Sequence, residues 1–181
     1  MPDDDEYGGE AAGDTRGDAE GVSQREHERA IELAYRAVAY RERTVAELRM
    51  FLERKRVGPC AIEAAVTELS EAGLLDDARY ARRFAEDKRE LERWGSERIA
   101  RELQRRGVLS DLIEAAIAGR SRESELSRAL LVLEGRLPPP GGDRERDRAW
   151  RLLVRRGYET EVAYEAVRLY ERAAGDARRA A

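Results

Sequence analysis

The feature that most constrains this chain of 181 residues is an internal repeat that occurs three times. Residues 46–57 align without a gap on residues 97–108 at a shift of 51 positions. Residues 148–158 align on the second copy at a shift of 50, and the apolar positions stay in register, so that Leu52 corresponds to Leu103. Self-similarity at a fixed period is typical of proteins that stack small structural units. The sequence therefore predicts three tandem copies of one unit.

Each unit is predicted to contain three helices. Apolar residues recur at helical spacing in residues 24–41, 77–93 and 123–136, which indicates the first helix of each unit. The aligned segments form the second helices, and the third helices start near Pro59, Ser110 and Thr160. Three short helices bury little apolar surface alone, so neighbouring units are expected to stack. The expected fold is all-α, with three tandem three-helix repeats in an elongated, curved array.

The predicted organisation places three repeats between two tails. The boundaries are a disordered acidic tail at 1–23, repeats at 24–76, 77–120 and 121–174, and a disordered C-terminal tail at 175–181. The first 29 residues hold ten acidic side chains against three arginines. With few large apolar residues, such a segment cannot offset its ordering entropy by burial. A solubilising role is expected for it, and the alternatives are screening of a basic surface or mimicry of nucleic acid.

Several residues carry the signals of helix starts. Thr44 and Glu47 have the spacing of a capping box, and Ser96 stands at the equivalent start in the second unit. Asp76 and Asp77 precede or open the helix predicted from 77 onwards. N-capping and the helix dipole explain two adjacent acids at that place, so no metal site is expected there.

Composition limits the chemistry that the chain can perform. Its only cysteine is Cys60 and its only histidine is His27, which leaves no internal disulfide and no Cys/His set for zinc. No nucleophile motif and no glycine-rich phosphate loop is present, so we expect neither catalytic residues nor a cofactor. The start of the chain lacks the features of a secretory signal, and no apolar run approaches the length of a membrane span. A cytoplasmic protein without enzymatic activity is expected.

Arginines concentrate on the first two helices of the second unit. Arg98, Arg101 and Arg105 follow a spacing of three and four, which places them on one helix face opposite the apolar positions. Arg148 and Arg151 repeat this row in the third unit. Cations at helix C-termini also offset the helix dipole, and interleaved acids can pair with them. The rows are therefore predicted to contact an acidic partner, with helix stabilisation as the structural alternative.

Two segments resemble the RecX family of bacterial recombination regulators. Residues 71–81 (Glu-Ala-Gly-Leu-Leu-Asp-Asp-Ala-Arg-Tyr-Ala) are similar to one family signature, and residues 95–108 (Gly-Ser-Glu-Arg-Ile-Ala-Arg-Glu-Leu-Gln-Arg-Arg-Gly-Val) resemble its second motif. The resemblance covers about residues 28–172. The chain departs from the family pattern at Arg56, where the first repeat often has glycine, and in its proline-rich loop and long acidic tail.

The resemblance implies a protein that lies in the groove of the RecA filament on single-stranded DNA, spans neighbouring protomers and inhibits ATP hydrolysis, strand exchange and repressor cleavage. A monomer is expected because no apolar heptad stripe in the sequence remains unassigned. We expect the basic rows of the array to contact the filament through several weak sites. The expected partner-binding residues are Arg79, Arg82, Arg89, Arg98, Arg101 and Arg105, followed by Arg148 and Arg151. The competing hypotheses are a sequence-tolerant binder of single-stranded nucleic acid and a helical scaffold.

Overall fold

The computed structural model describes residues 15–119 and 121–180, and these residues form helices and connections without a β-strand. In chain order the helices are α1 (Thr15–Tyr40), α2 (Val45–Arg54), α3 (Pro59–Glu71), α4 (Asp77–Glu92), α5 (Ser96–Arg105), α6 (Ser110–Ile117), α7 (Arg122–Glu134), α8 (Asp143–Arg155) and α9 (Thr160–Ala180). The prediction of an all-α fold is confirmed. No helix in this part of the chain is both long and apolar enough to cross a bilayer.

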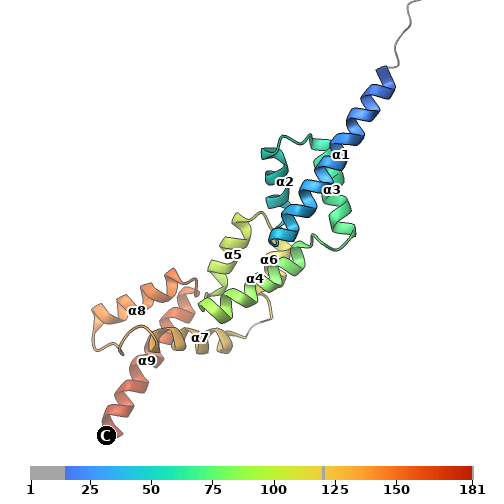
Figure 1. Cartoon of the computed structure of the whole chain (residues 1–181). Helices are drawn as coiled ribbons and strands as arrows, with labels where there is room; N and C mark the ends of the chain where they lie inside the picture. The colour runs from blue at the N-terminus through green and yellow to red at the C-terminus, as the bar shows by residue number, and fades with distance from the viewer. Residues whose placement is uncertain (1–14, 120, 181) are drawn as a thin grey trace, which may run out of the picture.

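The helices pack in three groups of three. α1, α2 and α3 contact one another, as do α4, α5 and α6, and then α7, α8 and α9. Each group, called here the first, second or third repeat, encloses its own cluster of buried apolar side chains. The three repeats follow one another along an elongated array, with α2, α5 and α8 on the same side (Figure 1). This arrangement confirms the predicted array of tandem repeats.

The aligned apolar positions explain why the second helix of each repeat packs inward. Leu48 and Leu52 on α2, and Ile99 and Leu103 on α5, are fully buried, as is Leu153 on α8. Residues four apart lie on the same face of a helix, so each pair faces its own cluster. Burial of one such side chain stabilises the fold by about 1.5 to 3 kcal/mol.

The start of α2 forms only half of the expected capping box. The hydroxyl oxygen of Thr44 accepts a hydrogen bond from the backbone N–H of Glu47 at 3.1 Å, as predicted. The Glu47 carboxylate instead pairs with Arg41 at 2.9 Å and with Arg106, in the second repeat, at 3.1 Å. The capping position therefore also serves a contact between repeats.

Ser96 is not the N-cap of α5, so that prediction is wrong. Gly95 occupies the N-cap position, and Ser96 is the first residue of the helix. The Ser96 hydroxyl contacts the Glu125 carboxylate on α7. A Cβ atom on Gly95 would lie only 2.2 Å from the carbonyl oxygen of Gly157, so the third repeat leaves no room here for a capping side chain.

The two acids near the start of α4 have different roles. Asp76 is the N-cap, and its carboxylate accepts from the backbone N–H of Arg79 at 2.8 Å, which confirms the capping interpretation. Asp77 accepts from the backbone N–H of Val45 at 2.9 Å and so links α4 to the start of α2. Burial raises the pKa of Asp77, and the hydrogen bond from Val45 opposes that shift.

Two junctions join the repeats, and both are formed by equivalent parts of the repeat. In the first junction the hydroxyl of Thr44 donates to the carbonyl oxygen of Arg106 at 2.7 Å. In the second junction the backbone N–H of Gly95 donates to the carbonyl oxygen of Arg156 at 2.9 Å. Thr44 corresponds to Gly95, and Arg106 to Arg156, at the shifts seen in the sequence. The turn after the second helix of one repeat therefore docks on the start of the second helix of the preceding repeat.

Glycine is required in both docking turns. Gly107 has φ +76° and Gly157 has φ +85°, which is the left-handed region that glycine adopts without strain. A Cβ atom on Gly107 would lie 2.3 Å from the Cβ atom of Ala46, and one on Gly157 would lie 2.3 Å from the backbone nitrogen of Arg98. Any larger residue would push the repeats apart.

The corresponding turn of the first repeat carries Arg56, with φ +58°. In the described part of the chain no repeat precedes it, and the side chain is exposed. The Lys55 carbonyl, which corresponds to those of Arg106 and Arg156, accepts instead from Nη2 of Arg29 on α1 at 3.1 Å. The carbonyl of this turn is therefore hydrogen-bonded within the first repeat. Because no other repeat packs against the turn in the described part of the chain, it can carry arginine where the other two turns need glycine.

The outer helices extend beyond the predicted repeats. α1 begins at Thr15 and α9 ends at Ala180, so both continue into the segments 1–23 and 175–181 that the sequence predicts as disordered. Residues 1–14, which hold most of the predicted acidic tail, lie outside the described residues, as does residue 181. Lengthening an existing helix needs no new nucleation, which is the physical reason that a helix can run past its last packed turn.

Candidate partner-binding surface

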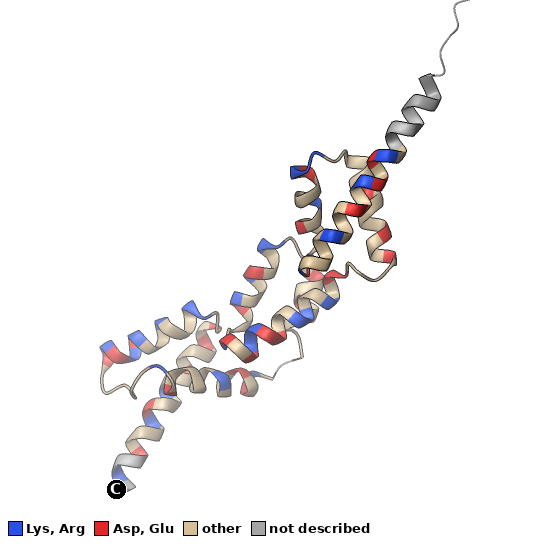
Figure 2. Ribbon diagram, viewed as in Figure 1, with Lys and Arg blue, Asp and Glu red and all other residues tan. Residues whose placement is uncertain are grey.

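The predicted arginines lie on α4, α5 and α8, in the second and third repeats. Basic residues recur along α5 and α8 on the side of the array that these helices share with α2 (Figure 2). The row in α5 and the row in α8 are brought to successive positions along the array because the second helices are equivalent parts of the repeat. The structure therefore places the two helices that carry the rows on one side of the molecule.

Three of the predicted arginines are exposed and free of a carboxylate partner. These residues are Arg82 on α4, Arg101 on α5 and Arg148 on α8. Among the described residues, none of the three has an ion pair, a hydrogen bond from its side chain or a ring contact. Their guanidinium groups therefore present full charge and five unused N–H donors to a partner.

Three others are exposed but already paired. Arg105 lies 2.6 Å from a carboxylate oxygen of Glu102, and Arg151 lies 2.8 Å from Asp147. Arg79 donates to the carbonyl oxygen of Gly73 at 2.8 Å and lies 3.8 Å from the Asp76 carboxylate. Exposed pairs of this kind contribute little to stability, about 0 to 1 kcal/mol, and a partner can compete for them.

The exposure expected for Arg89 is wrong. Its side chain is 6% exposed, and its guanidinium donates to the carbonyl oxygens of Ala116 and Ile117 at 3.3 and 3.4 Å. These carbonyls lie at the C-terminal end of α6, where a cation offsets the helix dipole. Arg89 therefore joins α4 to α6 inside the second repeat and is removed from the candidate surface.

Arg98 is half-buried against the indole ring of Trp94. Its guanidinium carbon lies 3.9 Å from the ring centroid, within the range of a cation–π contact. Trp94 also meets Phe84 edge-on, with ring centroids 6.3 Å apart, at the end of α4. Tyr80 stacks on Phe84 with ring centroids 6.1 Å apart, and both rings pack against the apolar cluster of the second repeat.

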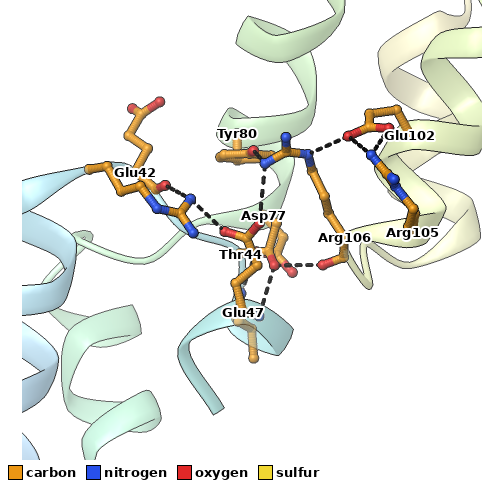
Figure 3. Close-up of polar contacts among 10 residues, drawn as sticks. Glu42, Thr44, Glu47, Asp77, Tyr80, Glu102, Arg105 and Arg106 are labelled. Carbon is orange, nitrogen blue, oxygen red and sulfur yellow. Dashed lines mark hydrogen bonds and ion pairs between the residues drawn. The ribbon is translucent and has the colours of Figure 1, made fainter. Parts of the chain in front are cut away.

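Arg106 is not among the expected partner-binding residues, and it is the centre of a polar network at the first junction (Figure 3). Its guanidinium donates to the Glu47 carboxylate at 3.1 Å, to the Tyr80 hydroxyl at 2.8 Å and to the Glu102 carboxylate at 3.2 Å. Burial by itself lowers the pKa of Arg106, but its neighbours outweigh that effect and raise it. Burial by itself raises the pKa of Glu102, but the hydrogen bonds and charges of Arg105 and Arg106 outweigh burial and lower that pKa.

The remaining inventory of the described residues offers few other ligating groups. Cys60 is free and exposed. No set of three or more His, Cys, Asp or Glu side chains in the described ranges is placed to hold a metal ion. The chemistry that the surface does offer is the binding of anions by guanidinium groups.

Comparison with known proteins agrees with the geometry. A family model described as RecX, second three-helix domain, matches residues 76–117. Regulatory protein RecX of Deinococcus radiodurans is 38% identical over 147 residues, which cover 80% of this chain and 70% of that protein. Regulatory protein RecX of Lactobacillus delbrueckii is 34% identical over 123 residues, which are 65% of this chain but only 45% of the relative.

The fold also matches a solved structure. The crystal structure of RecX from Lactobacillus salivarius superimposes with a TM-score of 0.75 over 82% of this chain and 98% of that one. The two sequences are 14% identical, so this match shows that the fold is shared and nothing more. The repeat architecture and the sequence identity to the Deinococcus protein lead to the same assignment: this chain belongs to the RecX family of regulatory proteins.

Proposed function

We propose that this protein regulates the RecA recombinase by binding along its filament, without catalytic chemistry of its own. Binding would inhibit ATP hydrolysis, strand exchange and co-protease activity, as the family resemblance implies. The observation that carries the proposal is the set of exposed, unpaired arginines on successive repeats, represented by Arg82, Arg101 and Arg148. A cytoplasmic monomer is the proposed acting form.

The elongated shape suits a polymeric target. A filament presents the same protomer surface at regular intervals, so the second and third repeats can each contact one copy. Individual contacts between exposed charges are weak, but two linked contacts act at high effective concentration. The proposed partner surface is acidic, because the free groups on the array are cationic.

Charge reversal at the unpaired positions tests this proposal. We expect the double variant Arg101→Glu, Arg148→Glu to need at least about tenfold more protein for half-maximal inhibition of DNA-dependent ATP hydrolysis by RecA. Both side chains are exposed and without partners, so the helical content measured by circular dichroism should not change.

The matched control is Arg25→Glu on α1, which is also exposed and without a partner among the described residues. Inhibition by the control should equal that of the unchanged protein. If the double variant inhibited as well as the control, the arginine rows would not be the contact surface. Tight, steeply salt-dependent binding to bare single-stranded DNA, with no added effect of RecA, would favour the competing nucleic-acid binder.

A further inference from the structure

A hollow of about 520 Å³ lies at the second junction, apart from the free arginines described above. It is bounded by the C-terminal end of α4, the start of α5, the end of α7 and the turn after α8. Its size is within the range of about 300 to 1,000 Å³ that holds small ligands. Because both the second and the third repeat contribute to its walls, the hollow exists only when these repeats are docked.

Four guanidinium groups line this hollow. They belong to Arg93, Arg98, Arg136 and Arg156. Among the described residues none of the four forms an ion pair with a carboxylate, whereas Arg106 at the first junction does. The concentrated positive charge is therefore left without a counter-ion within the fold.

The single carboxylate in the lining does not neutralise this charge. Glu92 is paired with Lys88, one helical turn earlier on α4. Like charges in a partly enclosed site repel one another, and the repulsion is relieved when an anion enters. In the protein alone, the positive charge of the hollow is therefore not neutralised.

Three of the four guanidinium groups are held in place by uncharged partners. Arg93 donates to the carbonyl oxygen of Leu131 at 3.0 Å, and Arg156 donates to that of Glu92 at 2.6 Å. Arg98 lies against the Trp94 ring. Each of these contacts orients the side chain but leaves its charge and most of its donors available, so less side-chain entropy is lost on binding.

The backbone at Arg93 supports a role for its side chain. This residue ends α4 with φ +54°, in the left-handed region that glycine adopts without strain. An arginine in this conformation costs about 1 kcal/mol relative to glycine. The chain nevertheless places a guanidinium here, and that group lines the hollow.

We propose that the hollow at the second junction binds a ligand that carries a chain of two or more phosphate groups. Planar guanidinium forks match phosphate oxygens in pairs, and several phosphates are needed to engage four of them. Recognition of a base by stacking is not the main attraction, because the Trp94 ring already carries the cations of Arg98 and Lys88 at 3.9 and 5.0 Å. The shared chemistry is a run of several phosphate groups, linked directly in a free compound or through sugars in a nucleotide polymer.

Calorimetric titration of the full chain with tripolyphosphate tests the proposal. We expect saturable binding in about 150 mM salt, where long-range attraction between exposed charges is screened. The variant Arg136→Ala should weaken this binding by about tenfold or more, because one charge-assisted contact is lost. Arg136 is exposed, and its side chain makes no hydrogen bond, ion pair or ring contact among the described residues, so the variant should fold normally.

The matched control is Arg144→Ala on α8, which removes an equally unpaired, exposed arginine outside the hollow. This control should bind tripolyphosphate like the unchanged protein. An unchanged protein that shows no saturable binding would overturn the proposal. So would equal losses in the two variants, since these would indicate diffuse attraction by net charge.

The source of the phosphates is found by competition. If a short single-stranded oligonucleotide displaces tripolyphosphate and also binds the Arg136→Ala variant more weakly, the natural ligand is a polymer. If the oligonucleotide does not compete, the ligand is a free compound such as a nucleoside triphosphate. Arg136 is not among the arginines that carry the proposed RecA contact, so binding of tripolyphosphate and inhibition of RecA can fail independently.

Discussion

At the scale of single residues, arginine has four distinct roles in this protein. Arg101 is exposed and unpaired, whereas Arg105, four residues later on the same helix, is paired with Glu102. Arg89 is buried and holds the end of α6. Arg106 bridges two repeats. The residue type alone therefore does not indicate a binding function, and the surroundings of each guanidinium decide it.

Tyr158 is the buried polar residue of the second junction, and its removal should weaken that junction. The side chain is 1% exposed, and its hydroxyl donates to the Arg93 carbonyl at 3.1 Å. We expect Tyr158→Phe to lower the free energy of unfolding by about 1 kcal/mol near neutral pH, because a partly buried carbonyl loses its donor. Tyr164→Phe, at an exposed tyrosine, should change it by less than about 0.5 kcal/mol.

The raised pKa of Tyr158 predicts that the free energy of unfolding depends on pH. Burial raises the pKa of Tyr158 from 10.0 to about 12, so on alkalinisation the unfolded chain releases this proton before the folded chain does. Stability from this residue is full below pH 10 and declines as pH rises to about 12. The difference in unfolding free energy between the unchanged protein and Tyr158→Phe should therefore narrow over that interval in urea titrations. A constant difference would contradict the assigned burial.

At the scale of elements, each repeat contains the same turn after its second helix, and in the second and third repeats this turn docks on the preceding repeat. Gly107 and Gly157 bring their turns into backbone contact with the preceding repeat. Arg56 occupies the same turn in the first repeat, which no other repeat precedes among the described residues. The glycine in the sequence pattern thus marks contact between repeats as well as backbone conformation.

Two alanine variants separate these two requirements. Gly73 and Gly157 both have positive φ, but a Cβ atom on Gly73 would meet nothing within 4 Å. Gly73→Ala should lower the free energy of unfolding by about 1 kcal/mol, the strain of the backbone alone. Gly157→Ala should cost about 1 to 3 kcal/mol more, because its Cβ atom would clash with Arg98. Urea unfolding followed by circular dichroism measures both, and equal losses would argue against close docking.

At the scale of the whole molecule, three small cores in a row replace one shared core. The repeats follow one another in a line (Figure 1), so the array is long and its surface is large for its mass. Such a shape spreads its free arginines over a distance, which suits a partner that is itself extended. It also places a charged hollow at a junction between two repeats.

The extended shape is directly measurable. A compact chain of 181 residues would have a radius of gyration of about 16 Å. Small-angle scattering of the monomer should give a clearly larger value, because the repeats are arranged in a line (Figure 1). The helical content of the same sample should match a folded protein, which excludes unfolding as the cause. A value near 16 Å would mean that the repeats fold back on one another.

The sequence by itself determined the all-α class, the three copies and most helix limits, because hydrophobic periodicity and caps act over one or two helical turns. It also indicated which helices carry the arginine rows. The limits of the repeats at 24–76, 77–120 and 121–174 stay predictions.

Only the tertiary structure decided which cations are free. Arg106 donates to the Glu47 carboxylate, 59 residues earlier in the chain, and Arg89 donates to the carbonyl oxygen of Ala116, 27 residues later. Ser96 loses its expected capping role because a turn from the third repeat occupies the space at Gly95. These outcomes depend on distances between elements far apart in the chain, and local spacing carries no information about such distances.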